Sequence, residues 1–357
     1  MRLLVDILHP AHVHVFGALA RELGKRGHEV RFTLREKECA RELLDQRGLS
    51  YETLSQQHRG VGLASEFVQR SARLWKVVSD FRPHFLAGIM GPSITMVGRL
   101  RRALGHDRTR VAVFYDTEIA KLTNTIVYPL ADYVCTPDCY SAPVRGNHLT
   151  YPGYHELAYL HPHRFTPDAD MVRSMGIDPT SRYFLLRFVS YQASHDLGTD
   201  GLTIGQKIQL VRTLRDYGTV YVSSEGPLPE ELEPHRLHIP ASVIHDVVSF
   251  ARLLVGESAT MASEAAVLGV PAVYISPHGR GYTDDQERRY GLVKNFTGDL
   301  FFGDWLSEVE GLAADPELKD KARAARARLL SEKTDVAQWM ADFFESEYDR
   351  HFADRAA

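Results

Sequence analysis

The chain has 357 residues, of which 44% are hydrophobic and 25% are charged, and its formal net charge is -4. This length and composition indicate a globular protein of two domains, and the lack of a basic excess argues against a dedicated nucleic-acid binder. Three cysteines are too few for a disulfide framework. No secretory signal opens the sequence and no run of about 18 apolar residues occurs, so we expect a cytoplasmic protein with at most peripheral contact with the inner face of the cell membrane.

Short apolar runs alternate with amphipathic stretches along the first part of the chain. Strands are predicted at 3–8, 29–34, 84–89, 111–115 and 131–136, and helices at 16–25, 37–47 and 93–104. This alternation is typical of a parallel sheet covered by helices on both faces. We therefore expect a Rossmann-like acceptor domain over residues 1–150.

The alternation of predicted strands and helices is interrupted once and then continues. Residues 151–167 are rich in proline, glycine and aromatic side chains, which predicts an interdomain connection. Further strands are predicted at 183–188, 219–223, 253–256 and 272–276, with helices at 205–217, 243–251 and 260–268. A second domain is expected over 168–335, followed by a C-terminal helix within 336–357 that can pack back on the first domain.

The segment 254–275 carries the clearest functional signal. A strand ends in the small residues Gly256 and Ser258, and a helix starts near Thr260, so backbone N–H groups and the positive helix end favour an anion there. Glu264 follows one helical turn later, where its carboxylate can accept hydrogen bonds from a ribose diol. The alternative is a capped helix with a solvated Glu264.

The segment resembles the donor-nucleotide motif of the GT-B superfamily. In both, a strand and small residues are followed by Ser263-Glu-Ala-Ala-x-x-Gly-x-Pro271 and a further strand. It is similar to that of the peptidoglycan N-acetylglucosaminyltransferase and of UDP-N-acetylglucosamine 2-epimerases, and it implies that Glu264 binds ribose. Nearly the whole chain resembles the domain-of-unknown-function family numbered 354, through Asp6-Ile-x-x-Pro-x-His-Val-His-x-Phe16, Asp116-x-Glu118 and Tyr151-Pro-Gly-Tyr-x-Glu-x-x-Tyr-Leu160. The resemblance implies an α/β GT-B fold of two Rossmann-like, doubly wound domains facing across a cleft.

Other second-domain residues are expected near a nucleotide-sugar donor. Arg187 ends a strand and is expected to clamp the diphosphate, although a surface ion pair is the alternative. By resemblance to related transferases, residues 240–244 cradle the base. The same resemblance implies that Asp285 and Gln286 contact the sugar, although a solvated loop is the alternative. The complete set of expected donor contacts is Arg187, Ser190, Ser223, Ala241, Gly256, Glu257, Ser258, Ala259, Thr260, Glu264, Asp285 and Gln286.

Catalytic candidates lie in the first domain at the ends of predicted strands. They are His12 and His14 in the first strand-to-helix turn, and Asp116 and Glu118 after the strand at 111–115. A histidine near neutral pKa, or a carboxylate, can act as the base on an acceptor hydroxyl. The alternatives are helix capping or packing, and a metal site formed by His9 with the other two histidines.

Together these features predict a metal-independent glycosyltransferase that uses no cofactor. The donor is a nucleotide diphosphate-sugar, with a UDP-sugar favoured, and the unknown acceptor is lipid-linked or a polysaccharide in cell-surface glycoconjugate synthesis. The alternatives are a UDP-sugar 2-epimerase, hydrolysing or not, and a non-catalytic nucleotide-sugar-binding protein.

A basic patch is formed by residues 99–102, Arg108 and Arg110. It can bind anionic lipid or an acidic acceptor, or it can be a solvated helix face.

Overall fold

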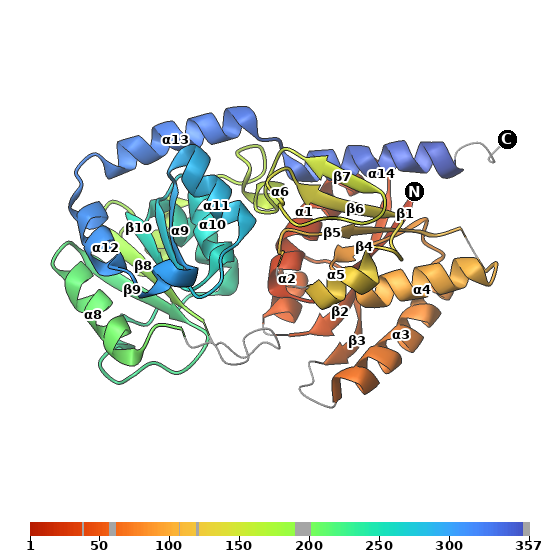
Figure 1. The fold of residues 1–357 in the computed structure, drawn as a ribbon, viewed down its shortest axis with the longest axis horizontal. Helices are drawn as coiled ribbons and strands as arrows, with labels where there is room; N and C mark the ends of the chain where they lie inside the picture. The colour runs from red at the N-terminus through yellow and green to blue at the C-terminus, as the bar shows by residue number, and fades with distance from the viewer. Residues whose placement is uncertain (38, 57–61, 107, 119–120, 190–200, 353–357) are drawn as a thin grey trace. The chain divides into compact units, whose positions relative to one another are not determined.

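The computed structural model describes residues 1–37, 39–56, 62–106, 108–118, 121–189 and 201–352. They form two compact units, each with its own parallel sheet (Figure 1). The first unit consists of Met1–Tyr159 and Thr334–Ala357, and the second of Leu160–Lys333. Residues 151–159 of the expected connection therefore belong to the first unit.

The first unit is built on a seven-stranded parallel sheet with the order β3-β2-β1-β4-β5-β6-β7. Its strands are β1 (Arg2–Ile7), β2 (Glu29–Glu36), β3 (Tyr51–Gln56), β4 (Phe85–Ile89), β5 (Arg110–Phe114), β6 (Tyr133–Pro137) and β7 (His148–Tyr151). The chain runs outward from β1 to β3 and then returns to β4 on the other side of β1. The strand order thus reverses between β1 and β4, and ligands bind at such reversals in open α/β sheets.

Helices cover both faces of this sheet (Figure 1). They are α1 (Pro10–Lys25), α2 (Ala40–Gln46), α3 (Gly62–Phe81), α4 (Pro92–Ala103), α5 (Lys121–Val127) and α14 (Val336–Phe352), with the short α6 (Leu157–Leu160) at the change of unit. Leu4 points to the face covered by α3 and α4, where it packs with Leu74 and Val97. On the other side, the ring of Phe85 lies 5.3 Å from that of Phe344, so the last helix completes the first unit.

The second unit contains a five-stranded parallel sheet with the order β12-β11-β10-β8-β9. The strands are β8 (Tyr183–Phe188), β9 (Thr219–Ser224), β10 (Leu253–Gly256), β11 (Ala272–Ser276) and β12 (Val293–Thr297). Here the order reverses between β8 and β10, where Arg187 and Gly256 are paired in register. The second unit therefore also has a reversal of strand order, where ligands bind in such sheets, and the expected donor residues Arg187 and Gly256 lie at it.

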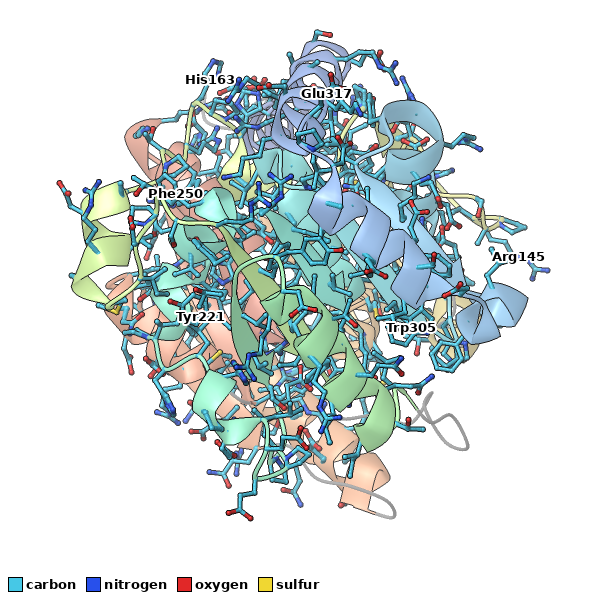
Figure 2. The ribbon with its side chains drawn as sticks, turned by 90° about the vertical axis from the view of Figure 1, so that its left-hand side faces the viewer. Arg145, His163, Tyr221, Phe250, Trp305 and Glu317 are labelled. Atoms are coloured by element: carbon cyan, nitrogen blue, oxygen red, sulfur yellow. The ribbon has the colours of Figure 1, made fainter. Side chains whose placement is uncertain are left out.

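The helices of the second unit are short. They are α7 (Ala169–Ser174), α8 (Ile204–Arg215), α9 (Ile244–Phe250), α10 (Ala259–Leu268), α11 (Gly281–Asp285), α12 (Trp305–Ala314) and α13 (Leu318–Glu332), with the tighter or wider turns η1 (Glu233–His235), η2 (Ala241–Val243), η3 (Gln286–Tyr290) and η4 (Gly298–Phe302). Trp305, which is labelled in Figure 2, belongs to the same buried cluster as Leu210 and Phe184. In α10, Ala262, Ala265 and Ala266 are fully buried, so small side chains cover the packed surface of this helix.

The expected strands and helices of both halves are confirmed, together with the doubly wound arrangement of each sheet. No strand was predicted at β3, β7 or β12, and no helix at α3, α5, α7 or α12. Of the six residues of β3 only Leu54 is buried, so this edge strand shows almost no apolar pattern. No helix among the described residues has the length and apolar character needed to cross a membrane.

Candidate functional site

The reversal between β8 and β10 is the centre of the candidate donor site. Gly256 ends β10, and a Cβ atom at this position would lie 2.2 Å from the carbonyl oxygen of Arg187. The N–H of Glu257 donates to that same carbonyl, at 2.9 Å. Only glycine allows the two strands to approach this closely, and the pairing fixes the start of α10 at the carboxyl edge of the sheet.

Helix α10 presents free donors at this edge. Ser258 is its N-cap residue, and its hydroxyl accepts a hydrogen bond from the N–H of Met261 at 3.3 Å. Among the described residues, no acceptor binds the N–H groups of Ala259 and Thr260. These two donors and the positive end of the helix suit a phosphate group.

Glu264 lies on α10 and is only 5% exposed. Its Oε1 lies 2.9 Å from Nε2 of His245, which is 4% exposed and belongs to α9. The expected base-binding residue Ala241 lies in η2, directly before α9. The structure thus gives the expected ribose ligand a fixed histidine partner, which holds the carboxylate in one orientation.

Arg187 is already engaged by neighbouring side chains. Its guanidinium donates to Oγ of Ser223 at 2.9 Å and to Oε1 of Glu225 at 2.5 Å, while its Nε is buried with no hydrogen-bond partner among the described residues. The structure therefore joins two expected donor contacts, Arg187 and Ser223. It also adds a carboxylate that offsets the arginine charge.

Glu257 makes internal contacts. Its side chain is fully buried and accepts from the N–H groups of Val189 and Leu202, at 3.1 and 2.6 Å, and lies 3.2 Å from Nζ of Lys207. Burial raises the pKa of Glu257. The carboxylate ties the end of β8 to the start of α8, whereas Ser190, another expected contact, lies outside the described residues.

Asp285 and Gln286 are both buried at the junction of α11 and η3. Asp285 pairs with Arg288 at 3.0 Å and with the fully buried Lys333 at 3.5 Å. Gln286 donates from Nε2 to Oγ of Ser263 on α10, at 2.8 Å, and its Oε1 is buried with no partner among the described residues. Gln286 is thereby linked to α10.

The first unit forms an acid–base pair at the carboxyl ends of β5 and β7. Oδ2 of Asp116 lies 2.9 Å from Nδ1 of His155, which is 4% exposed. Burial opposes ionisation of Asp116, but the charge and hydrogen bond of His155, with a hydrogen bond from Thr117, lower its pKa to about 2. Burial likewise opposes protonation of His155, yet the charge and hydrogen bond of Asp116 raise its pKa. Together the two residues form a buried imidazolium–carboxylate pair.

His12 has a different electrostatic state. It lies in the first turn of α1, and its Nδ1 accepts the N–H of Leu8 at 3.3 Å. Burial, followed by the charge of His9, lowers the pKa of His12 well below its usual value, while the charge of Asp116 opposes the shift. Because Nδ1 is an acceptor in a neutral ring, Nε2 carries the proton. His12 is thus better suited to donate a hydrogen bond than to remove a proton.

The two other histidines of this turn also use their Nδ1 atoms. Nδ1 of His9 accepts the N–H of Ala11 at 3.2 Å, which caps α1. Nδ1 of His14 accepts from Nη2 of Arg47 at 2.6 Å. The carboxylate of Glu118, another expected catalytic residue, accepts the N–H of Ser141 at 3.5 Å.

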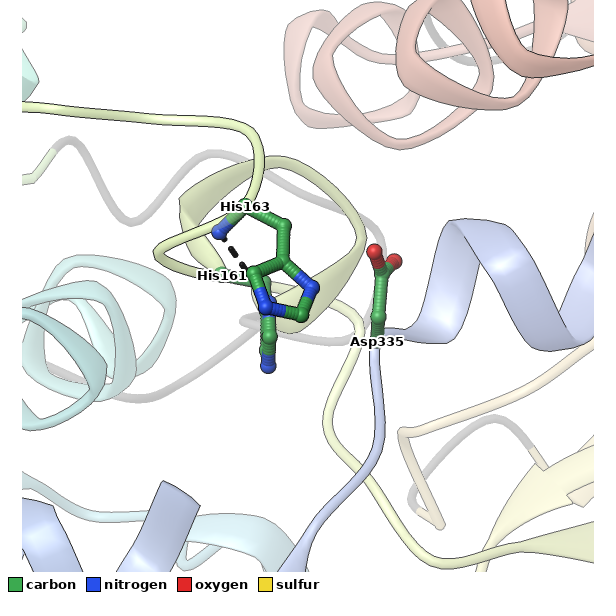
Figure 3. A group of neighbouring side chains, drawn as sticks. All are labelled: His161, His163 and Asp335. Carbon is green, nitrogen blue, oxygen red and sulfur yellow. Dashed lines mark hydrogen bonds between the residues drawn. The ribbon is translucent and has the colours of Figure 1, made fainter.

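Sequence reasoning missed the two histidine partners, His155 and His245. His155 occupies an unspecified position within the junction motif 151–160, and His245 follows the expected base-binding stretch by one residue. The available signals were the place of His155 inside the junction motif and that of His245 directly after the expected base-binding stretch. Two further histidines, His161 and His163, are close in sequence and contact each other. The backbone N–H of His163 donates to Nδ1 of His161 at 3.3 Å (Figure 3).

Two doubly wound parallel-sheet units with these strand orders give the chain the GT-B fold. The chain belongs to the family described as "Protein of unknown function (DUF354)", whose model matches residues 1–286. No curated protein matches the sequence.

Solved structures resemble the whole chain at low sequence identity. MurG of Acinetobacter baumannii is 14% identical with a TM-score of 0.59, and the match covers 97% of this chain and 99% of MurG. A Listeria monocytogenes protein assigned as a UDP-N-acetylglucosamine 2-epimerase is 12% identical with a TM-score of 0.68, covering 99% and 97% of the two chains. S. aureus MnaA bound to UDP has the same identity, TM-score and coverages. These likenesses show the fold.

Proposed function

We propose that the protein is a glycosyltransferase that moves a sugar from a nucleotide diphosphate-sugar to an acceptor. The observation that carries this proposal is the arrangement on α10, where two free N–H donors precede Glu264 by one helical turn. A diphosphate fits the donors and a ribose diol fits the carboxylate. A UDP-sugar is favoured because S. aureus MnaA, which shares the fold, was solved with UDP.

The donor site would work by positioning and electrostatics. In the proposed reaction the acceptor oxygen bonds to the anomeric carbon of the sugar, the bond from that carbon to the diphosphate breaks, and the acceptor proton passes to a base. The positive end of α10 would stabilise the departing diphosphate, so we propose that no metal ion or other cofactor is needed. Activity that survives removal of divalent cations by EDTA is the expected result.

The first unit would supply the acceptor-side groups. Asp116 is ionised and oriented by His155, and His12 is a neutral donor. We propose that the carboxylate of Asp116, which His155 holds in place, accepts the proton of the acceptor hydroxyl, and that His12 hydrogen-bonds the acceptor. The acceptor would be lipid-linked or a polysaccharide, which places the reaction in cytoplasmic synthesis of cell-surface glycoconjugates with at most peripheral membrane contact.

A thermal-shift panel of UDP, GDP, CDP, ADP and dTDP tests the donor site first. A nucleotide that binds only the folded protein raises its melting temperature. One nucleotide is expected to stabilise the wild type and to lose this effect in Glu264→Ala. Glu310→Ala serves as the matched control, because it removes an exposed carboxylate on α12 that binds Tyr217 and is not among the expected donor contacts. If no nucleotide raises the melting temperature, the donor proposal fails.

A UDP-sugar 2-epimerase is the second candidate. The two structures with a TM-score of 0.68 include one assigned to this activity, whereas the TM-score with MurG is 0.59. An epimerase needs no acceptor and removes the proton at C2 of the sugar. Incubation of the UDP-sugar in D2O without acceptor separates the two: deuterium at C2 indicates epimerisation, and turnover only with an acceptor indicates transfer. Nucleotide binding without either product would indicate a non-catalytic binding protein.

A further inference from the structure

A polar cavity of about 570 Å³ lies at the edge of the first sheet opposite Asp116. It opens where the parallel strands begin, since Arg2 starts β1 and His84 directly precedes β4. Its lining includes Arg2, Arg82, His84, Arg101, His106 and Arg108. This lining combines four arginines and two histidines, and it includes no carboxylate among the described residues.

Three of these arginines have no acidic partner in the described part of the chain. Arg2, Arg82 and Arg108 form no ion pair with a described carboxylate, although Asp107 lies outside the described residues. Arg101 is only 5% exposed, donates to Oγ of Ser79 at 2.6 Å and lies 4.8 Å from the ring centre of Trp75. A chain with a net charge of -4 therefore gathers positive charge in one hollow.

A neighbouring hollow of about 190 Å³ shares Arg108 and Phe352 and adds Arg102, Arg110 and His351. Arg102 and Arg110 both bind Asp132, at 2.6 and 3.0 Å. This one carboxylate therefore offsets about half of the charge of the two arginines. The unpaired arginines belong to the larger cavity.

The hydrogen bonding and the pKa of His84 agree with a positive local electrostatic field. Its Nδ1 accepts the backbone N–H of Arg2 at 2.8 Å, which leaves Nε2–H as a donor. Burial lowers the pKa of His84, and the positive charges of the amino terminus and Arg2 lower it further.

The backbone at Arg82 is also unusual. Its φ is +50°, in the left-handed region that residues with a side chain rarely adopt, and it directly precedes Pro83. Proline disfavours helical conformations in the residue before it. Strained residues of this kind gather at functional sites, and here the strained residue places a guanidinium in the lining of the cavity.

We propose that this cavity binds a small polyanion that carries phosphate groups, of the diphosphate class. Arginine forks match the planar arrangement of phosphate oxygens, and several of them can share one ligand with two phosphate groups. A volume of about 570 Å³ accommodates such a ligand. The site is separate from the proposed donor site, which lies in the second unit, so either proposal can hold without the other.

Isothermal titration of the full chain with inorganic pyrophosphate at 0.15 M NaCl tests the proposal. Saturable binding is expected, with one site per chain that depends on Arg108; a second site that is lost in Arg187→Ala belongs to the proposed donor site. Arg108→Gln and Arg82→Gly should each weaken it about tenfold or more, because each removes a charge-assisted donor. Arg82→Gly also suits the left-handed backbone, so the variant is expected to fold. Arg99→Gln is the matched control, since Arg99 is exposed on α4 but does not line the cavity.

Several outcomes would overturn the proposal. Absence of saturable binding would do so, as would an equal loss in Arg99→Gln, which would indicate non-specific attraction. Loss of binding in Arg187→Ala but not in Arg108→Gln would assign the pyrophosphate to the donor site. Binding of phosphatidylglycerol vesicles, but not of phosphatidylcholine vesicles, that is weakened by Arg108→Gln and unaffected by pyrophosphate would indicate a lipid surface in place of a small-anion site.

Discussion

At the scale of single residues, the Asp116–His155 pair sets the charge state of the first unit's candidate site. We expect Asp116→Asn to lower the pKa of His155, because the change removes the carboxylate that opposes the effect of burial. Histidine NMR titration of the imidazole proton resonances measures it. Thr117→Ala, which removes only a hydroxyl donor to Asp116, should leave the pKa of His155 raised. An unchanged His155 titration in Asp116→Asn would contradict the assigned pair.

The same pair predicts a pH-dependent stability. The pKa of Asp116 is about 2 instead of the usual 3.8, so its contribution is present above pH 3.8 and is lost as the pH falls toward 2. The pKa of His155 is raised above 6.5, so its contribution is present below that pH and is lost as the pH rises through the raised value. Between these limits, wild type should exceed Asp116→Asn by about 2 kcal/mol in free energy of unfolding. Urea unfolding from pH 2 to 9 checks it, and a difference that does not vary with pH would refute it.

At the scale of elements, the contact between β8 and β10 depends on one glycine. Gly256→Ala should lower the free energy of unfolding by about 3 kcal/mol, because the added Cβ meets the backbone of Arg187 at 2.2 Å and neither strand can yield cheaply. Gly311→Ala on α12 is the matched control: nothing lies within 4 Å of its added Cβ, and it should gain about 0.5–1 kcal/mol through helix propensity. Denaturant unfolding compares the two, and equal effects would contradict the close approach.

The elements also show what local sequence can predict. Strands such as β1, β8 and β10 are mainly apolar because both of their faces are buried, although Asp6 and Arg187 interrupt two of them. Their parallel pairing follows from the alternating helices. Glycine and a capping serine before α10 likewise identify the helix start. The edge strand β3 and the partners of Asp116 and Glu264 could not be found this way. They depend on which strand ends and helices the fold brings together. Such contacts between distant residues leave no short-range pattern in the sequence.

At the scale of the whole molecule, two separate cores allow ligand binding to be assigned to one unit. Trp305 packs in the core of the second unit, and the other two tryptophans, Trp75 and Trp339, belong to the first. In a Trp75→Phe, Trp339→Phe background, fluorescence therefore reports the unfolding of the second unit alone. UDP at 100 times its dissociation constant should stabilise that unit by about 2.7 kcal/mol.

The control for this measurement is Glu264→Gln in the same background. The substitution keeps the size of the side chain and removes the charge that would receive the ribose hydroxyls, so most of the UDP response should disappear. Because Glu264 also contacts His245, the unliganded stability of the variant is measured alongside, and only the change produced by UDP is compared. A full UDP response in Glu264→Gln would show that the nucleotide binds elsewhere. The converse chain, Trp305→Phe, reports the first unit through Trp75 and Trp339. UDP stabilisation that is seen in this chain, but not in the chain that keeps only Trp305, would place the nucleotide on the first unit.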